Sequence, residues 1–410
     1  MACLCTSSLS SSGAGAPAPL GLACRFHAAY NERLLAPLPA LRPLLPSAER
    51  ILPYLRRLDE TRTYTNWGPL ACELEHRLAA QFGVAQGAVV TASSGTSALA
   101  GAILATAGRA STDRPIAVLP AFTFVATALA VELCGYRPYI VDVSPSSWMM
   151  EPAALMDHPA LQRAGLVVPV APFGRPVALD KWLEFQLATR IPVVIDGAGS
   201  FESLASATGA FVGAVPVTLS FHATKTFSTG EGGCVVTTDP ALAARVGQAL
   251  NFGFFDDREC RIASMNGKMS EYHAAVGLAE LDGWPGKARA FGAVADAYRC
   301  AFETEGLADR LVCSPSVAGC YVLVRCGSEP ESSRVQACLA DADIGFRLWY
   351  GGGLLAHRQF GDVPHDDCTV TLGLGGSTLG LPVATDLHPR DIARVAAAIR
   401  RGVHAESPGS

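Results

Sequence analysis

The sequence predicts an α/β fold in which a large domain with a mostly parallel sheet precedes a smaller α+β domain. Apolar runs of strand length alternate with segments of helical periodicity through much of the chain. These runs are continuously apolar, which is typical of parallel strands buried on both faces. At 410 residues, the chain is long enough for two or three domains with a sizeable core.

The regular pattern follows a flexible tail, residues 1–30, and a Leu/Pro/Arg-rich lead-in, residues 34–63, which we expect to pack across the large domain. The predicted parallel strands are 88–92, 116–120, 139–143, 166–172 and 192–196, and the predicted helices are 71–82, 96–107, 124–134 and 178–188. Strands 217–221 and 234–238 are separated by a loop too short for a parallel crossover. One of them is therefore expected to run antiparallel to the rest.

We place the large domain, including its lead-in, at residues 31–287 and the small domain at 288–410. A long helix from 288 to 301 opens the small domain. A strand at 321–326 and helices near 333–342 and 389–401 complete its predicted elements. The boundary is placed where the parallel βαβ pattern stops.

Composition excludes several classes of protein. Half the residues are apolar, 17% are charged and the net charge is -5, which fits neither a disordered chain nor a nucleic-acid binder. The apolar stretch from Ile116 to Cys134 is interrupted by Pro120 and closed by Glu132, so we interpret it as strand, loop and helix, not as a membrane span. We find no metal-ligand spacing among the 13 cysteines and no signal peptide, and we expect reduced thiols in a cytoplasmic protein.

Lysine is rare in this chain. Only four of the 32 basic residues are lysines, and they are Lys181, Lys225, Lys268 and Lys287. A solvated surface accepts either cation. A lysine in an arginine-rich chain is therefore a candidate for a role that requires an amine. Lys181 and Lys287 are interpreted as surface residues, and Lys268 is assigned no role.

Polar or aromatic residues follow two of the predicted strands where a ligand of such a sheet would bind. Ser94, Gly95 and Thr96 form a small-residue turn into a helix, which suits a phosphate but is also found at ordinary helix caps. Phe122 and Phe124 follow the next strand. Either phenylalanine could cover a flat ring or fill the core.

Two further strand ends carry charged groups. Asp196 ends an apolar strand, where a carboxylate requires a cationic ligand or a hydrogen-bond network. The loop SFHATKTFSTGEGG brings together Ser220, His222, Lys225 and Glu231. Its lysine is either a loop charge or an amine for covalent chemistry. A phosphate, a flat ring, a ring cation and an aldehyde, one for each strand end, are together the parts of pyridoxal 5'-phosphate (PLP).

The same motifs carry a resemblance to a known family. TNWGPLACELE (65–75), SFHATK (220–225) and NGKMSEYHAAVGLAELD (266–282) occur in order, with a weaker match at GLPVATDL (380–387). The sequence resembles the DegT/DnrJ/EryC1/StrS family of PLP-dependent sugar aminotransferases, which have the type I, aspartate-aminotransferase-like fold. SFHATK is similar to the branch that contains nucleotide-linked 4-amino-4,6-dideoxyhexose synthases.

The resemblance implies a role for each matching residue. Lys225 corresponds to the Schiff-base lysine, Asp196 to the partner of the pyridinium nitrogen and Phe124 to the aromatic ring stacked on the cofactor. The family's residues that bind the cofactor phosphate correspond to Gly95, Thr96 and Ser220, with Ser94 beside the turn.

Two further positions concern the partner subunit and a departure from the family. Asn266 corresponds to an asparagine that reaches the phosphate of the neighbouring subunit, which implies a homodimer with shared active sites. Gly199 stands where many relatives have Gln or His, so one contact beside the cofactor ring is missing.

The implied reaction moves an amino group from L-glutamate to a keto sugar by a ping-pong mechanism, with pyridoxamine 5'-phosphate formed between the two halves. A keto-cyclitol is the alternative acceptor. A sugar 3-dehydratase would have histidine in place of Lys225, and a non-catalytic PLP-binding regulator would have lost Lys225 or Asp196. The segment GLGGSTLG (373–380) lacks the βαβ unit of a nicotinamide-binding enzyme.

Five residues are candidates for the substrate side of the site. Each has an ordinary alternative, such as His222 ordering its own loop or Trp67 filling the core. They are Tyr64, Asn66, Trp67, His222 and Glu231.

Overall fold

The computed structural model describes residues 36–206 and 213–405. The predicted tail, residues 1–30, lies outside the described residues. In the described part of the chain, no helix is long and apolar enough to cross a membrane.

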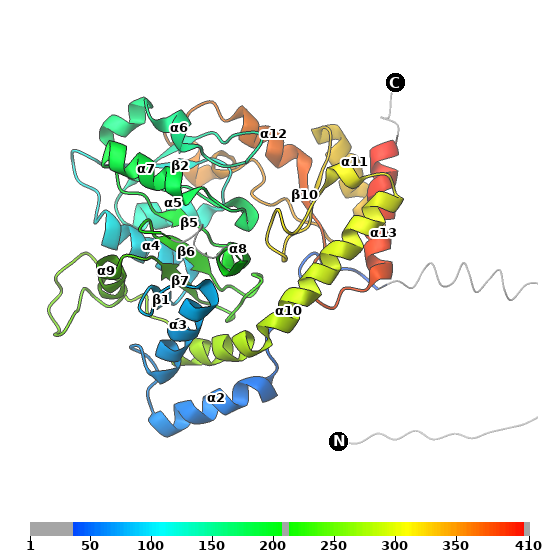
Figure 1. The fold of residues 1–410 in the computed structure, drawn as a ribbon. Helices are drawn as coiled ribbons and strands as arrows, with labels where there is room; N and C mark the ends of the chain where they lie inside the picture. The colour runs from blue at the N-terminus through cyan, green and yellow to red at the C-terminus, as the bar shows by residue number, and fades with distance from the viewer. Residues whose placement is uncertain (1–35, 207–212, 406–410) are drawn as a thin grey trace, which may run out of the picture. The chain divides into compact units, whose positions relative to one another are not determined.

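A central mixed sheet forms the larger part of the fold (Figure 1). The order β3-β2-β4 continues into β5-β6-β7-β1 through parallel bridges from Val167 to Val193 and from Val170 to Asp196. The strands are β1 (Val89–Ala92), β2 (Ile116–Pro120), β3 (Arg137–Val141), β4 (Ala164–Val167), β5 (Ile195–Asp196), β6 (Val217–Ser220) and β7 (Gly233–Val236). Of the two strands that the short loop separates, β6 and β7, it is β7 that runs antiparallel, and it lies between β6 and β1.

Helices cover both faces of this sheet. Alternate residues of its apolar strands therefore pack into two separate cores. Val89, Val217 and Val236 pack on one face, whereas Val90 and Val235 pack on the other. The first face is covered mainly by α3 (Pro69–Phe82), α7 (Leu179–Thr189) and α8 (Phe201–Ser206), and the second by α4 (Gly95–Thr106), α5 (Val125–Leu133) and α9 (Pro240–Leu250). The predicted α/β class is confirmed.

The lead-in contains a helix that the sequence pattern did not predict, α2 (Ala48–Thr61). It packs against α10 (Glu271–Thr304), which begins 17 residues before the predicted start at 288. The predicted start was wrong. A proline inside a helix removes a backbone hydrogen bond and usually kinks or ends the helix. The helix continues through Pro285 because its first half is buried against α2 and α3.

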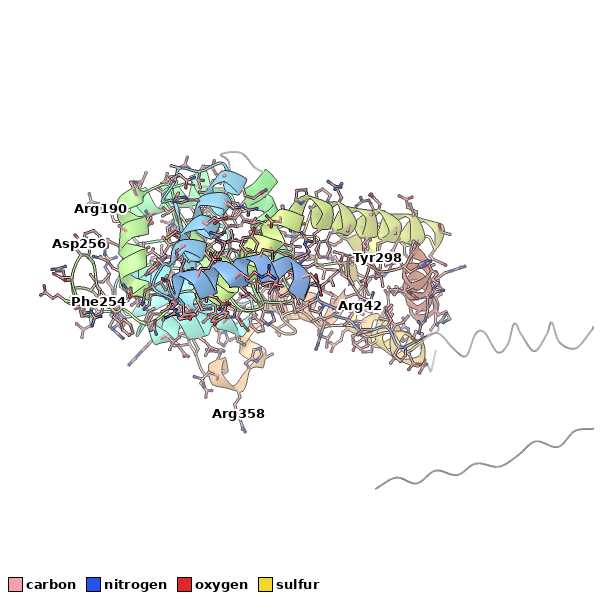
Figure 2. All side chains as sticks on the ribbon, turned by 90° about the horizontal axis from the view of Figure 1, so that it is seen from below. Arg42, Arg190, Phe254, Asp256, Tyr298 and Arg358 are labelled. Carbon is pink, nitrogen blue, oxygen red and sulfur yellow. The ribbon has the colours of Figure 1, made fainter. Side chains whose placement is uncertain are left out.

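The second half of α10 leads into a smaller sheet with its own apolar core (Figure 1). This sheet has the order β10-β9-β8, and its strands are β8 (Leu311–Val312), β9 (Leu323–Arg325) and β10 (Thr378–Gly380). The accompanying helices are α11 (Glu329–Asp341), α12 (Thr369–Ser377) and α13 (Pro389–His404). Tyr298 of α10 lies in this core and donates a hydrogen bond to the Pro382 carbonyl at 2.6 Å (Figure 2). We retain 287/288 as a proposed domain boundary, although α10 crosses it.

Candidate active site

Two neighbouring parallel strands end in the polar residues predicted from the sequence. β5 pairs with β6 so that Asp196 lies opposite Thr218, and β6 ends two residues later at Ser220. The carboxyl ends of parallel strands lie at the same edge of a sheet. Asp196 and Ser220 are therefore on one edge.

The turn into α4 meets this edge at Ser220. A Cβ atom on Gly95 would lie 2.7 Å from the Cβ of Ser220, and one on Gly233 would lie 2.8 Å from the Ser94 carbonyl oxygen. Side chains at these glycines would fill the space where the three segments converge. The first N–H groups of α4 have no partners within the helix. With the Ser220 hydroxyl, they form a cradle that can hold a phosphate.

Ser94 also caps α4. Its hydroxyl accepts a hydrogen bond from the Ser97 N–H at 3.0 Å, and its oxygen lies 2.7 Å from the Ser97 hydroxyl oxygen. The capping interpretation and the phosphate interpretation of this turn are therefore compatible, because a cap orders the N–H groups that a phosphate would use.

Asp196 is a buried carboxylate whose hydrogen bonds all come from uncharged groups. It is 8% exposed and accepts hydrogen bonds from the Thr127 hydroxyl at 2.7 Å and from the Ala198 N–H at 3.1 Å. Burial raises its pKa, against these two bonds and the positive charge of Lys225, which lower it. No ion pair to Asp196 is found in the ranges that the structure describes. A cationic ring would supply the missing positive charge.

Lys225 lies in the loop after β6, and its Nζ donates a hydrogen bond to the Tyr321 hydroxyl at 2.9 Å. The loop is ordered by its own backbone, since the Lys225 N–H bonds the His222 carbonyl at 2.9 Å. A small hollow reaches Lys225 from the lead-in side, and Leu41, Pro43 and Phe291 are among its other lining residues. The amine is therefore half-buried but accessible.

The two phenylalanines after β2 have different environments. Phe122 is fully buried and packs edge-to-face against Trp148, Phe173 and Tyr350. Phe124 precedes α5 and leaves 60% of its surface exposed. Phe122 is thus a core residue, whereas Phe124 is free to cover a flat ring.

Asn266 is exposed and lies beside a second lysine. Its side-chain oxygen accepts a hydrogen bond from the Lys268 Nζ at 2.8 Å, and this ammonium lies 4.4 Å from the centre of the Phe252 ring. Burial lowers the pKa of Lys268. An isolated antiparallel β-bridge joins the backbones of Asn266 and Asn251, so the segment that carries Asn266 is fixed in the large domain.

The structure separates the five substrate-side candidates into two groups. Trp67 donates its Nε1–H to Glu75 at 2.9 Å and packs against the core, which is its ordinary interpretation. Tyr64 is 44% exposed and stacks on Tyr272, and Asn66 is also exposed. Within the described ranges, no recorded contact joins these three residues to Lys225.

His222 and Glu231 form the second group and lie in the loop of Lys225. The His222 Nδ1 is 2.9 Å from the Thr224 hydroxyl oxygen, and its Nε2 is 3.8 Å from a Glu231 carboxylate oxygen. Both side chains are largely exposed. These contacts order the loop and leave both groups accessible to a ligand.

Gly199 is explained by packing. A Cβ atom at this position would lie 3.0 Å from the Gly174 nitrogen and 3.4 Å from the Phe173 carbonyl carbon. Phe173 and Gly174 both have a positive φ, at 56° and 78°, in the turn that fills this space. A glutamine or histidine at position 199 would therefore require this turn to shift.

Three residues that help to hold the predicted site residues in place by hydrogen bonds were not predicted from the sequence. Thr127 bonds Asp196, Tyr321 bonds Lys225, and Glu202 accepts the Gly319 N–H at 2.6 Å beside that tyrosine. Glu202 is the one with a sequence signal, since an acid soon after Asp196 in an apolar segment suggests burial. Tyr321 lies 96 positions from Lys225 and gives none.

Lys287 was interpreted as a surface residue, and this was wrong. Its Nζ contacts the carboxylate of Glu280 and donates a hydrogen bond to the Leu44 carbonyl at 3.0 Å. Both partners of the ion pair are largely buried, with side chains 14% and 5% exposed. The reason is α2 and the lead-in, which cover this part of α10.

The phosphate cradle, the buried carboxylate, the exposed aromatic ring and the accessible amine fit PLP. In the described ranges, no group of three or more His, Cys, Asp or Glu side chains is placed to hold a metal ion. The fold and the site define a PLP-dependent aminotransferase of fold type I.

The chain belongs to the DegT/DnrJ/EryC1/StrS aminotransferase family, whose model matches residues 47–400. It is 31% identical over 376 residues to Protein Rv3402c of Mycobacterium tuberculosis, and this match covers 88% of this chain and 89% of that protein. It is 31% identical over 248 residues to the dTDP-4-amino-4,6-dideoxy-D-glucose transaminase of Shigella dysenteriae, over 60% of this chain and 65% of that protein.

A solved structure has the same fold. DesI, crystallised in the presence of its TDP-sugar product, superposes with a TM-score of 0.79 at 28% identity. The match covers 90% of this chain and 94% of DesI.

Proposed function

We propose that this enzyme transfers the amino group of L-glutamate to a nucleotide-linked keto-deoxysugar. The observation that carries the proposal is the meeting of Lys225, Asp196 and the Ser220 cradle at one sheet edge. The nucleotide-linked acceptor is supported by two relatives, the Shigella dysenteriae transaminase and DesI, whose names or titles specify a dTDP- or TDP-sugar. Amino-sugar biosynthesis is the corresponding role.

Within this proposal, each residue at the edge has one task toward PLP. The N–H groups of Gly95 and Thr96, with the Ser220 hydroxyl, bind the phosphate. Ser94 orders that turn through its cap. Phe124 covers the ring.

Asp196 and Lys225 perform the chemical work. When bound, PLP supplies an electron-withdrawing ring that stabilises negative charge at the donor carbon. Asp196 holds a proton on the ring nitrogen, and the protonated nitrogen in turn favours the charged carboxylate, in the opposite direction to the effect of burial. The Lys225 amine would take the proton from the α-carbon of L-glutamate and deliver it to C4′ of the bound cofactor.

The same proposal includes a homodimer with shared active sites. Asn266 is exposed, which suits contact with the partner's phosphate. Phe252, Phe255 and Tyr272, on the same domain, are each about half exposed. Large exposed aromatic side chains favour an interface. Light scattering at micromolar protein tests the dimer, and Phe255→Asp is expected to weaken it.

Steady-state kinetics test the reaction. Initial rates measured against L-glutamate at several concentrations of a dTDP-linked 4-keto-6-deoxyhexose should give parallel double-reciprocal lines. Intersecting lines would contradict a ping-pong mechanism. Activity with a keto-cyclitol but not with the nucleotide sugar would retain the transaminase and change its acceptor.

A further inference from the structure

The amine of Lys225 is held by a tyrosine from a distant part of the chain. Its Nζ lies 2.9 Å from the Tyr321 hydroxyl oxygen and 5.6 Å from the centre of the Tyr321 ring. The ammonium therefore contacts the hydroxyl end of the side chain and does not lie on the ring face. Tyr321 is 6% exposed, so water has little access to this contact from the tyrosine side.

The backbone that carries Tyr321 is tied to the large domain. The Ala318 N–H donates to the Phe173 carbonyl at 2.9 Å, and the Gly319 N–H donates to the Glu202 carboxylate at 2.6 Å. A Cβ atom on Gly319 would lie 2.8 Å from the Phe291 Cβ and 2.9 Å from a Glu202 oxygen. Glu202 can approach this closely only because residue 319 is glycine.

Aromatic packing fixes the ring itself. Tyr321 packs edge-to-face against Phe173 at 5.4 Å and against Trp349 at 5.6 Å between ring centres. Burial raises the pKa of Tyr321 well above its ordinary value. The hydroxyl consequently keeps its proton, and it can accept a hydrogen bond from an ammonium or donate one to a free amine.

We propose that Tyr321 is a catalytic residue that orients the Lys225 amine and exchanges hydrogen-bond roles with it as Lys225 gains and loses a proton. This rests on the proposed role of Lys225. When the amine takes a proton from carbon, its lone pair becomes an N–H bond. Because the amine has a single lone pair, the Tyr321 O–H that donated to it turns away before the proton is taken, and the Tyr321 oxygen then accepts a hydrogen bond from one N–H of the ammonium. No proton leaves Tyr321.

The neighbouring Tyr350 provides a matched control for Tyr321→Phe. Both tyrosines belong to the same aromatic cluster, and the Tyr350 hydroxyl accepts the Phe173 N–H at 3.4 Å. In the described part of the chain, no hydrogen bond to Lys225 is recorded for it. Tyr350→Phe therefore removes a comparable hydroxyl without removing the contact under test.

The first experiment uses the protein without cofactor. Acetylation by acetic anhydride at fixed pH is followed by peptide mass spectrometry, with the exposed Lys181 as the internal reference. Loss of one hydrogen bond should accelerate Lys225 acetylation about threefold to tenfold in Tyr321→Phe. The rate should be unchanged in Tyr350→Phe. An unchanged rate in Tyr321→Phe would overturn the inference.

The second experiment uses the PLP-loaded enzyme. Tyr321→Phe should lower kcat about tenfold, keep KM for L-glutamate and increase the isotope effect of donor deuterated at the α-carbon. An unchanged kcat and isotope effect would overturn the catalytic role even if acetylation changes. Borohydride reduction of wild-type enzyme should place the cofactor on Lys225. Its recovery on another lysine would overturn the proposed function separately.

Discussion

Gly95→Ala tests the phosphate cradle, because the added methyl group would collide with Ser220. The new Cβ would lie 2.7 Å from the Ser220 Cβ, 3.0 Å from its hydroxyl oxygen and 3.1 Å from its Cα. The last contact is with backbone, so rotation of the serine alone does not relieve it. Overpacking of this kind costs about 1–3 kcal/mol of folding free energy.

The same displacement should also weaken cofactor binding. The Ser220 hydroxyl would move from the N–H groups of α4, and a hydrogen bond to a charged phosphate contributes about 1.5–3 kcal/mol. PLP affinity should therefore fall about tenfold to a hundredfold. Titration of the apoprotein with PLP, monitored by absorbance, measures this change, and urea unfolding measures the stability.

Gly247→Ala is the matched control. Gly247 lies in α9, and a Cβ atom there would meet nothing within 4 Å. Alanine should raise the unfolding free energy by about 0.5–1 kcal/mol and leave PLP affinity unchanged. PLP binding to Gly95→Ala with wild-type affinity would refute the cradle.

Three other substitutions separate stability from function. Burial raises the pKa of Asp196 in the folded apoprotein above its ordinary value of 3.8. The protonated side chain therefore stabilises the fold below pH 3.8, and this stabilisation is lost as pH rises through the folded-state pKa. Asp196→Asn should accordingly raise the apoprotein's melting temperature at neutral pH and reduce kcat/KM at least about a hundredfold; a lower melting temperature would contradict the burial argument. Phe124→Ala should weaken PLP binding about twofold to tenfold with no change in melting temperature, since the ring is 60% exposed, and unchanged binding would remove it from the site. Lys287→Met leaves the buried Glu280 carboxylate unpaired and should cost about 3–5 kcal/mol in urea unfolding, whereas Lys181→Met should cost almost nothing; equal costs would show that the ion pair contributes no stability.

Much of the sheet edge could be predicted because its signals are local. Asp196 and Ser220 each end an apolar run, and Gly95 opens the helix after another. Parallel strands place their carboxyl ends together, so residues far apart in sequence could be assigned to one site. The length of the loop between β6 and β7 likewise predicted that one of the two runs antiparallel, and the structure identifies it as β7.

The parts that were missed depend on long-range packing. Tyr321 reaches Lys225 only through contacts of its turn with Phe173 and Glu202. The start of α10 was placed too late because the burial of its first half comes from α2 and α3, which lie far away in the sequence. Lys287 was wrongly predicted to be a surface residue because the segments that cover it, α2 and the lead-in, are also far away in the sequence.

Lys225 is the centre of the account, and an absorbance titration tests it most directly. Wild-type protein with PLP should show a visible band that is lost on adding L-glutamate and restored by the keto sugar. Lys225→Ala should lack this response while retaining the fold. No band in the wild type, or an unchanged band and response in Lys225→Ala, would contradict the assignment of this lysine.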